Sequence, residues 1–287
     1  MAQEWSGKTG GTHWMQRALI SIIRHTDIRV AYAAMHLWLI WYILVRRTER
    51  NGAYTFHRRR GRSRMQAAVD VYRSFYHFGK AIIDRFAVYA GQRFDVLVDN
   101  RELYYGRVQS DEGFVMLFSH VGNTEMAGYF LSTPDKRLHI LAYAGESPVV
   151  MEHRRQELAR NNIDMIAVQP GDMSHIYRVS EVLQQGDVLA MAADRRTGEA
   201  VTMCTFMGSR APLPEGPFRV CKAVRKPVLL VFVLKQDAHT YRVTCQELQP
   251  DKDLAQTYAQ AVEQVALQHP YEWFNFYDFW ARDPQDN

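Results

Sequence analysis

From about residue 91 onward, short apolar runs alternate with amphipathic stretches, and this alternation constrains the fold more than any other feature. The run FVMLF at residues 114–118 follows Gly113 and has the length and composition of a strand buried on both faces. Similar runs predict further strands at residues 139–143, 164–168, 188–193, 228–233 and 241–245. Helices are expected from about residue 124 and at residues 150–161, 174–185 and 254–268. Strands that alternate with helices predict an α/β domain with a mostly parallel sheet flanked by helices.

The first 90 residues have a helical rhythm instead, so we predict an N-terminal helical region at residues 1–90 and an α/β domain at residues 91–287. Residues 65–89 form one long amphipathic pattern. Residues 30–45, VAYAAMHLWLIWYILV, are the membrane candidate, but they fall short of the roughly 20 residues that a spanning helix needs. His36 interrupts them, and the Trp and Tyr side chains suit interfacial depth. We expect a helix that lies in one leaflet, with a single span or a buried core helix as the alternatives.

An arginine-rich run follows this segment directly, at Arg46, Arg47, Arg50, Arg58, Arg59, Arg60, Arg62 and Arg64, against the single acid Glu49. A solvated face, a nucleic-acid contact and a contact with anionic lipid headgroups are the three interpretations. Its place beside the apolar segment favours headgroups on the cytoplasmic face of the inner membrane, without a nucleic-acid partner. Cys204, Cys221 and Cys245 lie far apart, which indicates reduced thiols and no metal site.

The segment that follows the first strand of this domain has the residues for acid–base chemistry. His120 comes directly after the strand, at the carboxyl end, where open α/β sheets bind ligands. Gly122 permits a tight turn, Asn123 or Thr124 can cap the next helix, and Glu125 then lies in its first turn. From there a carboxylate can reach back, fix the imidazole tautomer and make His120 a general base. No nucleophilic serine accompanies the pair, so an acceptor hydroxyl or amine would attack; a structural histidine is the alternative.

The His-x-x-x-x-Glu pattern after an apolar strand resembles the motif of the lipid A late acyltransferase family, within the glycerolipid acyltransferase-like superfamily. The local sequence HVGNTE is similar to that family's His-x-Gly-Asn-Trp-Glu, with Thr124 in place of Trp. The blocks ADRR at 193–196, FMG at 206–208, PEGP at 214–217 and HPYEWF at 269–274 resemble further family blocks in order and spacing. Met207 stands where the family has Phe, and the resemblance covers roughly residues 65–280.

The resemblance implies a set of site residues. His120 and Glu125 would be catalytic, and Asn123 would belong to the substrate-binding or oxyanion group. An arginine in the region of Arg160 helps the family stabilise the oxyanion of a thioester carbonyl, with Arg154 and Arg155 as competitors. Asp194 ends a strand and could orient arginines or cap a turn. Gly216 opens a helix whose N–H groups suit an anion, or is an ordinary helix start.

The resemblance further implies direct transfer of a fatty acyl chain to a hydroxyl or amine of a membrane lipid. The donor would be a thioester of acyl carrier protein or coenzyme A, and neither cofactor nor metal would be required. A lipid A precursor is the default acceptor, with an aminolipid, a glycolipid or an aryl polyene or flexirubin-type lipid as alternatives. A thioesterase or hydrolase, and a non-catalytic protein that binds membranes or nucleic acid through residues 46–64, are the rival interpretations.

Overall fold

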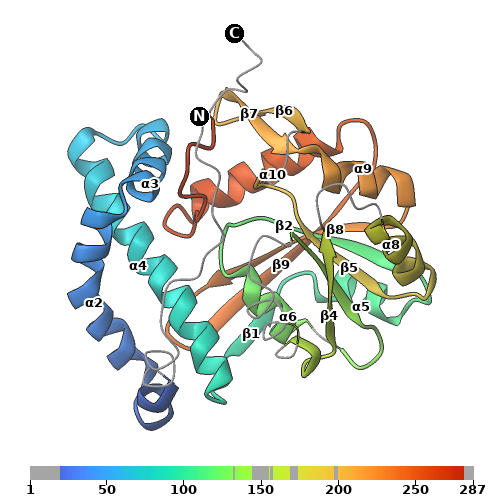
Figure 1. The fold of residues 1–287 in the computed structure, drawn as a ribbon, viewed down its shortest axis with the longest axis horizontal. Helices are drawn as coiled ribbons and strands as arrows, with labels where there is room; N and C mark the ends of the chain where they lie inside the picture. The colour runs from blue at the N-terminus through green and yellow to red at the C-terminus, as the bar shows by residue number, and fades with distance from the viewer. Residues whose placement is uncertain are drawn as a thin grey trace.

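A computed structural model describes residues 20–131, 133–143, 155, 158–168, 174–196 and 200–280. The expected helix at residues 150–161 lies mostly outside the described residues. Figure 1 shows an α/β body flanked on one side by three N-terminal helices. These are α2 (Ile28–Val45), α3 (Arg47–Arg59) and α4 (Arg64–Tyr89).

The body contains a seven-stranded sheet in the order β1-β9-β8-β2-β5-β3-β4. Its strands are β1 (Asp95–Val98), β2 (Phe114–Phe118), β3 (Leu138–Tyr143), β4 (Ile163–Val168), β5 (Val188–Ala192), β8 (Val228–Lys235) and β9 (Thr240–Leu248). Every neighbouring pair is parallel except β8 and β9. The prediction of a mostly parallel sheet flanked by helices is therefore confirmed, and each expected strand is present with its ends shifted by at most a few residues.

Alternate residues of the central strand β2 face opposite sides of the sheet, because side chains alternate along a strand. Val115 and Leu117 join a core with α8 (Ser174–Gln184), α9 (Glu215–Val224) and α10 (Leu254–Gln268). Phe114, Met116 and Phe118 join a second core with α5 (Arg101–Gln109) and α6 (Ala127–Phe130). The strand is buried on both faces, as its continuous apolar run predicts.

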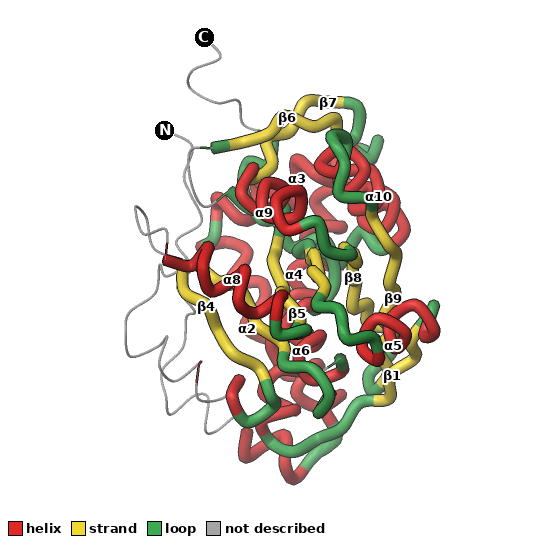
Figure 2. Tube along the Cα trace, turned by 90° about the vertical axis from the view of Figure 1, so that its right-hand side faces the viewer, coloured by secondary structure: helices red, strands yellow, loops and turns green. Residues whose placement is uncertain are grey.

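Three features of the strands differ from the sequence-based expectation, the first being that β1 was not expected as a strand. Strand β9 returns antiparallel to β8 because only four residues separate them, too few for the crossover that a parallel connection needs. A separate hairpin of β6 (Val201–Phe206) and β7 (Ser209–Pro214) was not expected as strands. Its two-residue loop is Met207-Gly208, both at positive φ, which is the backbone conformation that such tight hairpins require. Figures 1 and 2 both place this hairpin at one end of the molecule, against α10.

Helix α2 confirms the helix expected at residues 30–45, and its two faces have different surroundings. Ile28, Ala31, Tyr32 and Leu39 are buried, and the helix packs against α4. The opposite face exposes large apolar side chains, among them Leu37 at 82% and Trp38 at 70% exposure. Within the described residues, α2 is the one helix long and apolar enough to cross a membrane, and 22% of that window is buried.

Part of the arginine run is used inside the protein. Arg62 forms an ion pair with the buried carboxylate of Asp70 at 2.7 Å, and Arg60 contacts the His57 ring at 2.9 Å. Arg59 donates a hydrogen bond of 2.6 Å to the Ser209 hydroxyl of the hairpin and stacks on the Trp280 ring. These contacts tie α3 to the rest of the chain. Arg46 and Arg47, at the junction of α2 and α3, are exposed, and Arg46 pairs with Glu49 at 3.3 Å.

Candidate functional site

The site is built where β2 and its parallel neighbour β5 both end. Phe118 pairs with Ala192 as the last residues of the two strands. His120 and Asp194 each follow two residues later, so equal offsets bring them to the same carboxyl edge of the sheet. The His120 backbone N–H donates to one Asp194 oxygen at 2.6 Å, and the ring Nδ1 lies 2.7 Å from the other. The carboxylate is fully buried, while 27% of the His120 side chain is exposed.

The turn after His120 is clamped from both sides. Val121 forms an antiparallel bridge with Trp273, and Gly122 forms a parallel bridge with Val233 at the end of β8. The Gly122 N–H donates to the Glu272 carbonyl at 2.9 Å, and the Phe274 N–H donates to the His120 carbonyl at 2.8 Å. Because these bonds are main-chain contacts, the C-terminal segment and β8 together fix the direction in which the histidine leaves the sheet.

The same C-terminal segment surrounds Asp194 with polar partners. The Asn275 side chain donates to the Asp194 carboxylate at 2.7 Å, and the Tyr277 hydroxyl donates to the Asp194 carbonyl at 3.1 Å. Arg195 in turn donates to the Asn275 amide oxygen and to the Phe274 carbonyl, both at 2.8 Å. The carboxylate therefore accepts from two nitrogen atoms of His120 and one of Asn275, which satisfies a charge that burial alone would disfavour.

The electrostatics of the pair favour a neutral ring beside an ionised acid. Burial lowers the pKa of His120 below its ordinary value of 6.5, and Arg195 adds to this effect against the opposing pull of Asp194. Burial acts to raise the pKa of Asp194, but His120 and Arg195 outweigh it and hold that pKa below 3.8. Since a carboxylate only accepts hydrogen bonds, Nδ1 carries the proton. Within the described residues no hydrogen bond occupies Nε2, so its lone pair is available as a base.

Glu125 lies elsewhere than the sequence suggested. It is in the 3₁₀ helix η1 (Thr124–Met126), and its carboxylate forms an ion pair with Arg85 of α4 at 2.9 Å. The residue that bonds the His120 ring is Asp194, so the expectation that Glu125 holds the imidazole is corrected. The physical reason is that the short η1 turn carries Glu125 to the α4 side, whereas the β5 end faces the ring. A part for Glu125 in the reaction stays a prediction.

Asn123 belongs to the turn that follows His120, and its polar groups form hydrogen bonds within the protein. Its side-chain amide donates to the Ala81 carbonyl at 3.2 Å and to the Tyr241 hydroxyl at 3.0 Å, and its N–H donates to the Val233 carbonyl. These contacts fix the turn, and a substrate-binding part for Asn123 stays a prediction. Gly216 lies in the first turn of α9, after the hairpin strand β7 and outside the contacts that join His120 to Asp194.

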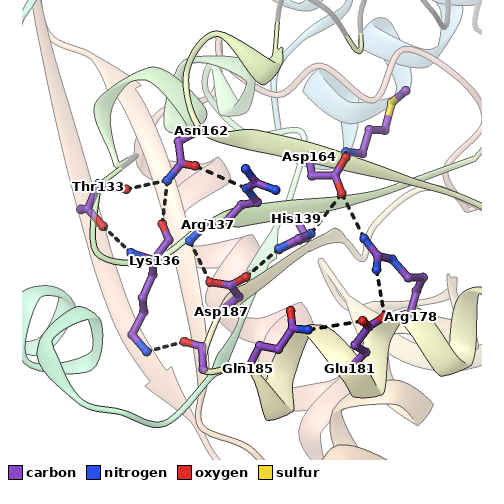
Figure 3. Close-up of polar contacts among 12 residues, drawn as sticks. Thr133, Lys136, Arg137, His139, Asn162, Asp164, Arg178, Glu181, Gln185 and Asp187 are labelled. Atoms are coloured by element: carbon purple, nitrogen blue, oxygen red, sulfur yellow. Dashed lines mark hydrogen bonds and ion pairs between the residues drawn. The ribbon is translucent and has the colours of Figure 1, made fainter.

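Arg160 lies at the opposite edge of the sheet. It is exposed, in the turn that precedes β4, and so is at the amino end of that strand. Figure 3 shows the neighbouring Asn162, whose amide donates to the Thr133 carbonyl at 3.0 Å ahead of β3. Lys136 reaches the Glu112 carbonyl at 3.1 Å, ahead of β2. His120 follows the carboxyl end of β2, so the structure does not bring Arg160 to it.

The same edge holds a histidine of another kind. His139 is buried, its Nε2 lies 2.9 Å from an Asp187 oxygen, and its Nδ1 lies 3.5 Å from Asp164 (Figure 3). Asp164 is also paired with Arg178. A buried ring enclosed by two carboxylates is a structural histidine, whereas the partly exposed ring of His120 has one carboxylate partner and an open Nε2.

Sequence reasoning missed Asn275, Tyr277 and Arg85 as parts of this site. For Asn275 and Tyr277, the nearest signal was the block at residues 269–274, which ends one residue before Asn275. Trp273 in that block is buried, and its ring stacks between the rings of Phe56 at 5.2 Å and Phe206 at 5.3 Å. The aromatic anchor therefore places the polar residues that follow it.

A sequence model described as bacterial lipid A biosynthesis acyltransferase matches residues 77–282, well over half of the chain. Among curated proteins, none matches the chain significantly. The matched segment contains His120, Asp194 and the C-terminal clamp that joins them. The chain therefore belongs to the bacterial lipid A biosynthesis acyltransferase family and is an acyltransferase.

Proposed function

We propose that this enzyme moves a fatty acyl chain from a thioester to a hydroxyl or amine of a membrane lipid, with His120 as general base. The observation that carries the proposal is the His120–Asp194 pair, in which a buried carboxylate orients a partly exposed imidazole. Family membership supports acyl transfer onto a lipid. A lipid A precursor is the default acceptor, and an aminolipid, a glycolipid or an aryl polyene or flexirubin-type lipid is the alternative.

The geometry supports direct transfer without an acyl-enzyme. Nε2 of His120 takes the proton of the acceptor hydroxyl or amine as the acceptor atom attacks the thioester carbonyl. Asp194 stabilises the imidazolium that forms, because its carboxylate accepts the Nδ1 proton. When the tetrahedral intermediate collapses, the carbon–sulfur bond breaks and the thiolate leaves, taking the proton from Nε2. The histidine is then neutral again.

A positive group would stabilise the oxyanion of that intermediate. Arg160 is at the wrong edge of the sheet for this part. Arg195 is close enough to lower the pKa of His120, and Arg85 is held at the catalytic turn by Glu125. We propose these two arginines as the candidates in place of Arg160. This assignment gives Glu125 a part in the reaction, as the residue that holds Arg85.

The lipid product identifies the acceptor. Mass spectrometry of membrane lipids from cells with and without the gene is expected to show one acylated species lost, and its structure names both acceptor and chain. Membranes of the gene-deleted cells then serve as acceptor for assays with acyl carrier protein and coenzyme A thioesters. Thioester cleavage at the same rate without any acceptor would instead indicate a thioesterase.

The transfer rate is expected to fall under acidic conditions. The base must be neutral, and the pKa of His120 lies below 6.5 because of burial and Arg195. The value of kcat/KM should therefore be highest at neutral pH and above, and it should decrease as pH falls through the His120 pKa. Replacing Asp194 with Asn removes the charge that favours the imidazolium, so the fall in kcat/KM should move to lower pH. A fall in kcat/KM with a midpoint above pH 7 would contradict a neutral His120 as the base.

We propose that the outer face of α2 rests on the cytoplasmic side of the inner membrane. Its exposed side chains are apolar, and Arg46 and Arg47 follow at its end, where anionic headgroups would meet them. Because the inner face of α2 packs on α4, a helix lying in the interface fits better than a span. The donor carrier, acyl carrier protein or coenzyme A, is decided by the assays above.

Replacing Trp38 and Trp41 with Asn is expected to lower partitioning onto vesicles that contain anionic lipid by at least about tenfold. Both side chains are exposed, at 70% and 60%, so the fold should be retained. The control is Tyr177→Asn, which changes an aromatic residue of α8 that is 82% exposed. Vesicle cosedimentation measures the effect, and equal binding by the double variant and the control would rule out this face.

A further inference from the structure

Helix α4 contacts the catalytic turn along one face. The Ala81 carbonyl accepts from the Asn123 side chain at 3.2 Å, and Arg85, one helical turn later, pairs with Glu125 at 2.9 Å. Asp84 lies between them in sequence and is fully buried. Residues three and four apart share a face of a helix, so one turn of α4 supports the whole loop.

Asp84 is the centre of a buried polar group formed with Lys235, Tyr32 and Tyr241, which we name the Asp84 cluster. Its carboxylate forms an ion pair with the Lys235 ammonium at 2.6 Å and accepts hydrogen bonds from the hydroxyls of both tyrosines. The ammonium also lies over the rings of Tyr32 and Tyr241. These residues come from α2, α4, β8 and β9, so the cluster joins the N-terminal helices to the sheet.

Two connections lead from this cluster to the catalytic turn. The Tyr241 hydroxyl, which donates to Asp84, accepts from the Asn123 amide at 3.0 Å. The Lys235 N–H donates to the Glu272 carboxylate at 3.2 Å, and the Glu272 carbonyl accepts from the Gly122 N–H at 2.9 Å. Both connections end within three residues of His120. A small displacement of the turn would therefore follow a change at Asp84, and misplacement by about 1 Å can cost about a hundredfold in rate.

The cluster contains one residue from outside the matched family region. Tyr32 belongs to α2, whereas the match begins at residue 77. We propose that Tyr32, Asp84 and Tyr241 are positioning residues that fix Asn123 and the catalytic turn, so that the seating of α2 on α4 sets the rate of acyl transfer. The proposal rests on the proposed function of His120. It makes the helix that we place on the membrane a part of the active-site framework.

Removing one hydroxyl tests this coupling without an unpaired buried charge. Replacing Asp84 or Lys235 would leave the other charge buried alone and unfold the protein. Tyr32→Phe keeps the ring and leaves Asp84 with two donors. We expect kcat to fall about tenfold, with the KM for the thioester changed by less than about twofold. The assay uses the full chain, the lauroyl and palmitoyl thioesters of both acyl carrier protein and coenzyme A, and membranes of gene-deleted cells.

The control is Tyr42→Phe, the same deletion on the same helix. The Tyr42 ring contacts Phe75 and lies under Arg46, away from the Asp84 cluster. Its kcat should equal that of the wild type. A Tyr32→Phe enzyme with wild-type kcat overturns the proposal, as does an equal loss in both variants, because that would be a general effect of α2.

A double-mutant cycle separates positioning from stability. If Tyr32 acts through Asn123, Tyr32→Phe should change kcat by less than about twofold in an Asn123→Ala background, although it still lowers the Tm. A full tenfold loss in that background would overturn the connection through Tyr241. His120→Ala in the same assay tests the proposed function separately: activity retained there refutes the base, whatever Tyr32→Phe does.

Discussion

Replacing Asp194 with asparagine is expected to lower kcat by about 10³- to 10⁴-fold, nearly as much as His120→Ala, while both proteins remain folded. The amide keeps the size of the side chain but loses the charge that stabilises the imidazolium. It also no longer requires the proton on Nδ1, so the ring can adopt the tautomer whose Nε2 is protonated and cannot act as a base. The measurement is the initial rate of lipid acylation at saturating thioester, with circular dichroism to verify the fold.

A matched control comes from the structural histidine at the other edge of the sheet. Asp187→Asn makes the same chemical change beside the buried ring of His139. We expect this variant to lose stability and to keep a kcat within about threefold of the wild type, because the pair is remote from the open Nε2 of His120. Wild-type turnover by Asp194→Asn, or an equal loss in Asp187→Asn, would show that the buried carboxylate of Asp194 does not orient a catalytic base.

The double mutant of His120 and Asp194 should be no slower than His120→Ala alone. Groups that act as a unit give strongly non-additive effects on kcat. Asp194 cannot orient an imidazole that the His120→Ala change has already removed. Asp194→Asn would therefore cost a thousandfold in the wild type and almost nothing in the His120→Ala background. Additive losses would instead indicate that Asp194 acts by folding or by binding substrate.

Most strands of the sheet could be predicted because a short apolar run in the local sequence marks each of them. The run at residues 114–118 needs no distant information to be recognised as buried, and it places His120 at the carboxyl edge. The register between β2 and β5 is not local. Asp194 lies 74 residues beyond His120, and only the pairing of Phe118 with Ala192 shows that both residues leave the sheet side by side.

Closeness in sequence favours Glu125 as the partner of His120. Such a pairing needs a full helix directly after the turn. The chain forms a 3₁₀ turn followed by the four-residue α6 instead, and Arg85 of α4 takes the carboxylate. Long-range ion pairs of this kind depend on how α4 crosses the sheet, which no periodicity specifies. The hydrogen bond from Asn275 to Asp194 was missed for the same reason.

Replacing Gly122 with alanine is expected to destabilise the protein by roughly 3 kcal/mol or more and to remove activity. Gly122 has φ of +77°, where a residue with a Cβ atom costs about 1–2 kcal/mol. A Cβ atom there would also lie 2.2 Å from the Val233 carbonyl oxygen. Neither side can yield easily, because β8 and the C-terminal segment both hold the turn through main-chain hydrogen bonds. Chemical denaturation measures the loss.

Two contributions to the loss of stability can be separated: the contact between the new Cβ atom and the Val233 carbonyl, and the unfavourable backbone conformation. Gly61 has φ of +78°, and a Cβ atom there would meet nothing within 4 Å, so Gly61→Ala carries the conformational cost alone. We expect it to lose about 1 kcal/mol and to keep full activity. If Gly122→Ala loses no more than this control and still transfers acyl chains, the turn is not clamped between β8 and the C-terminal segment. His120 would then need another source of its fixed orientation toward the acceptor.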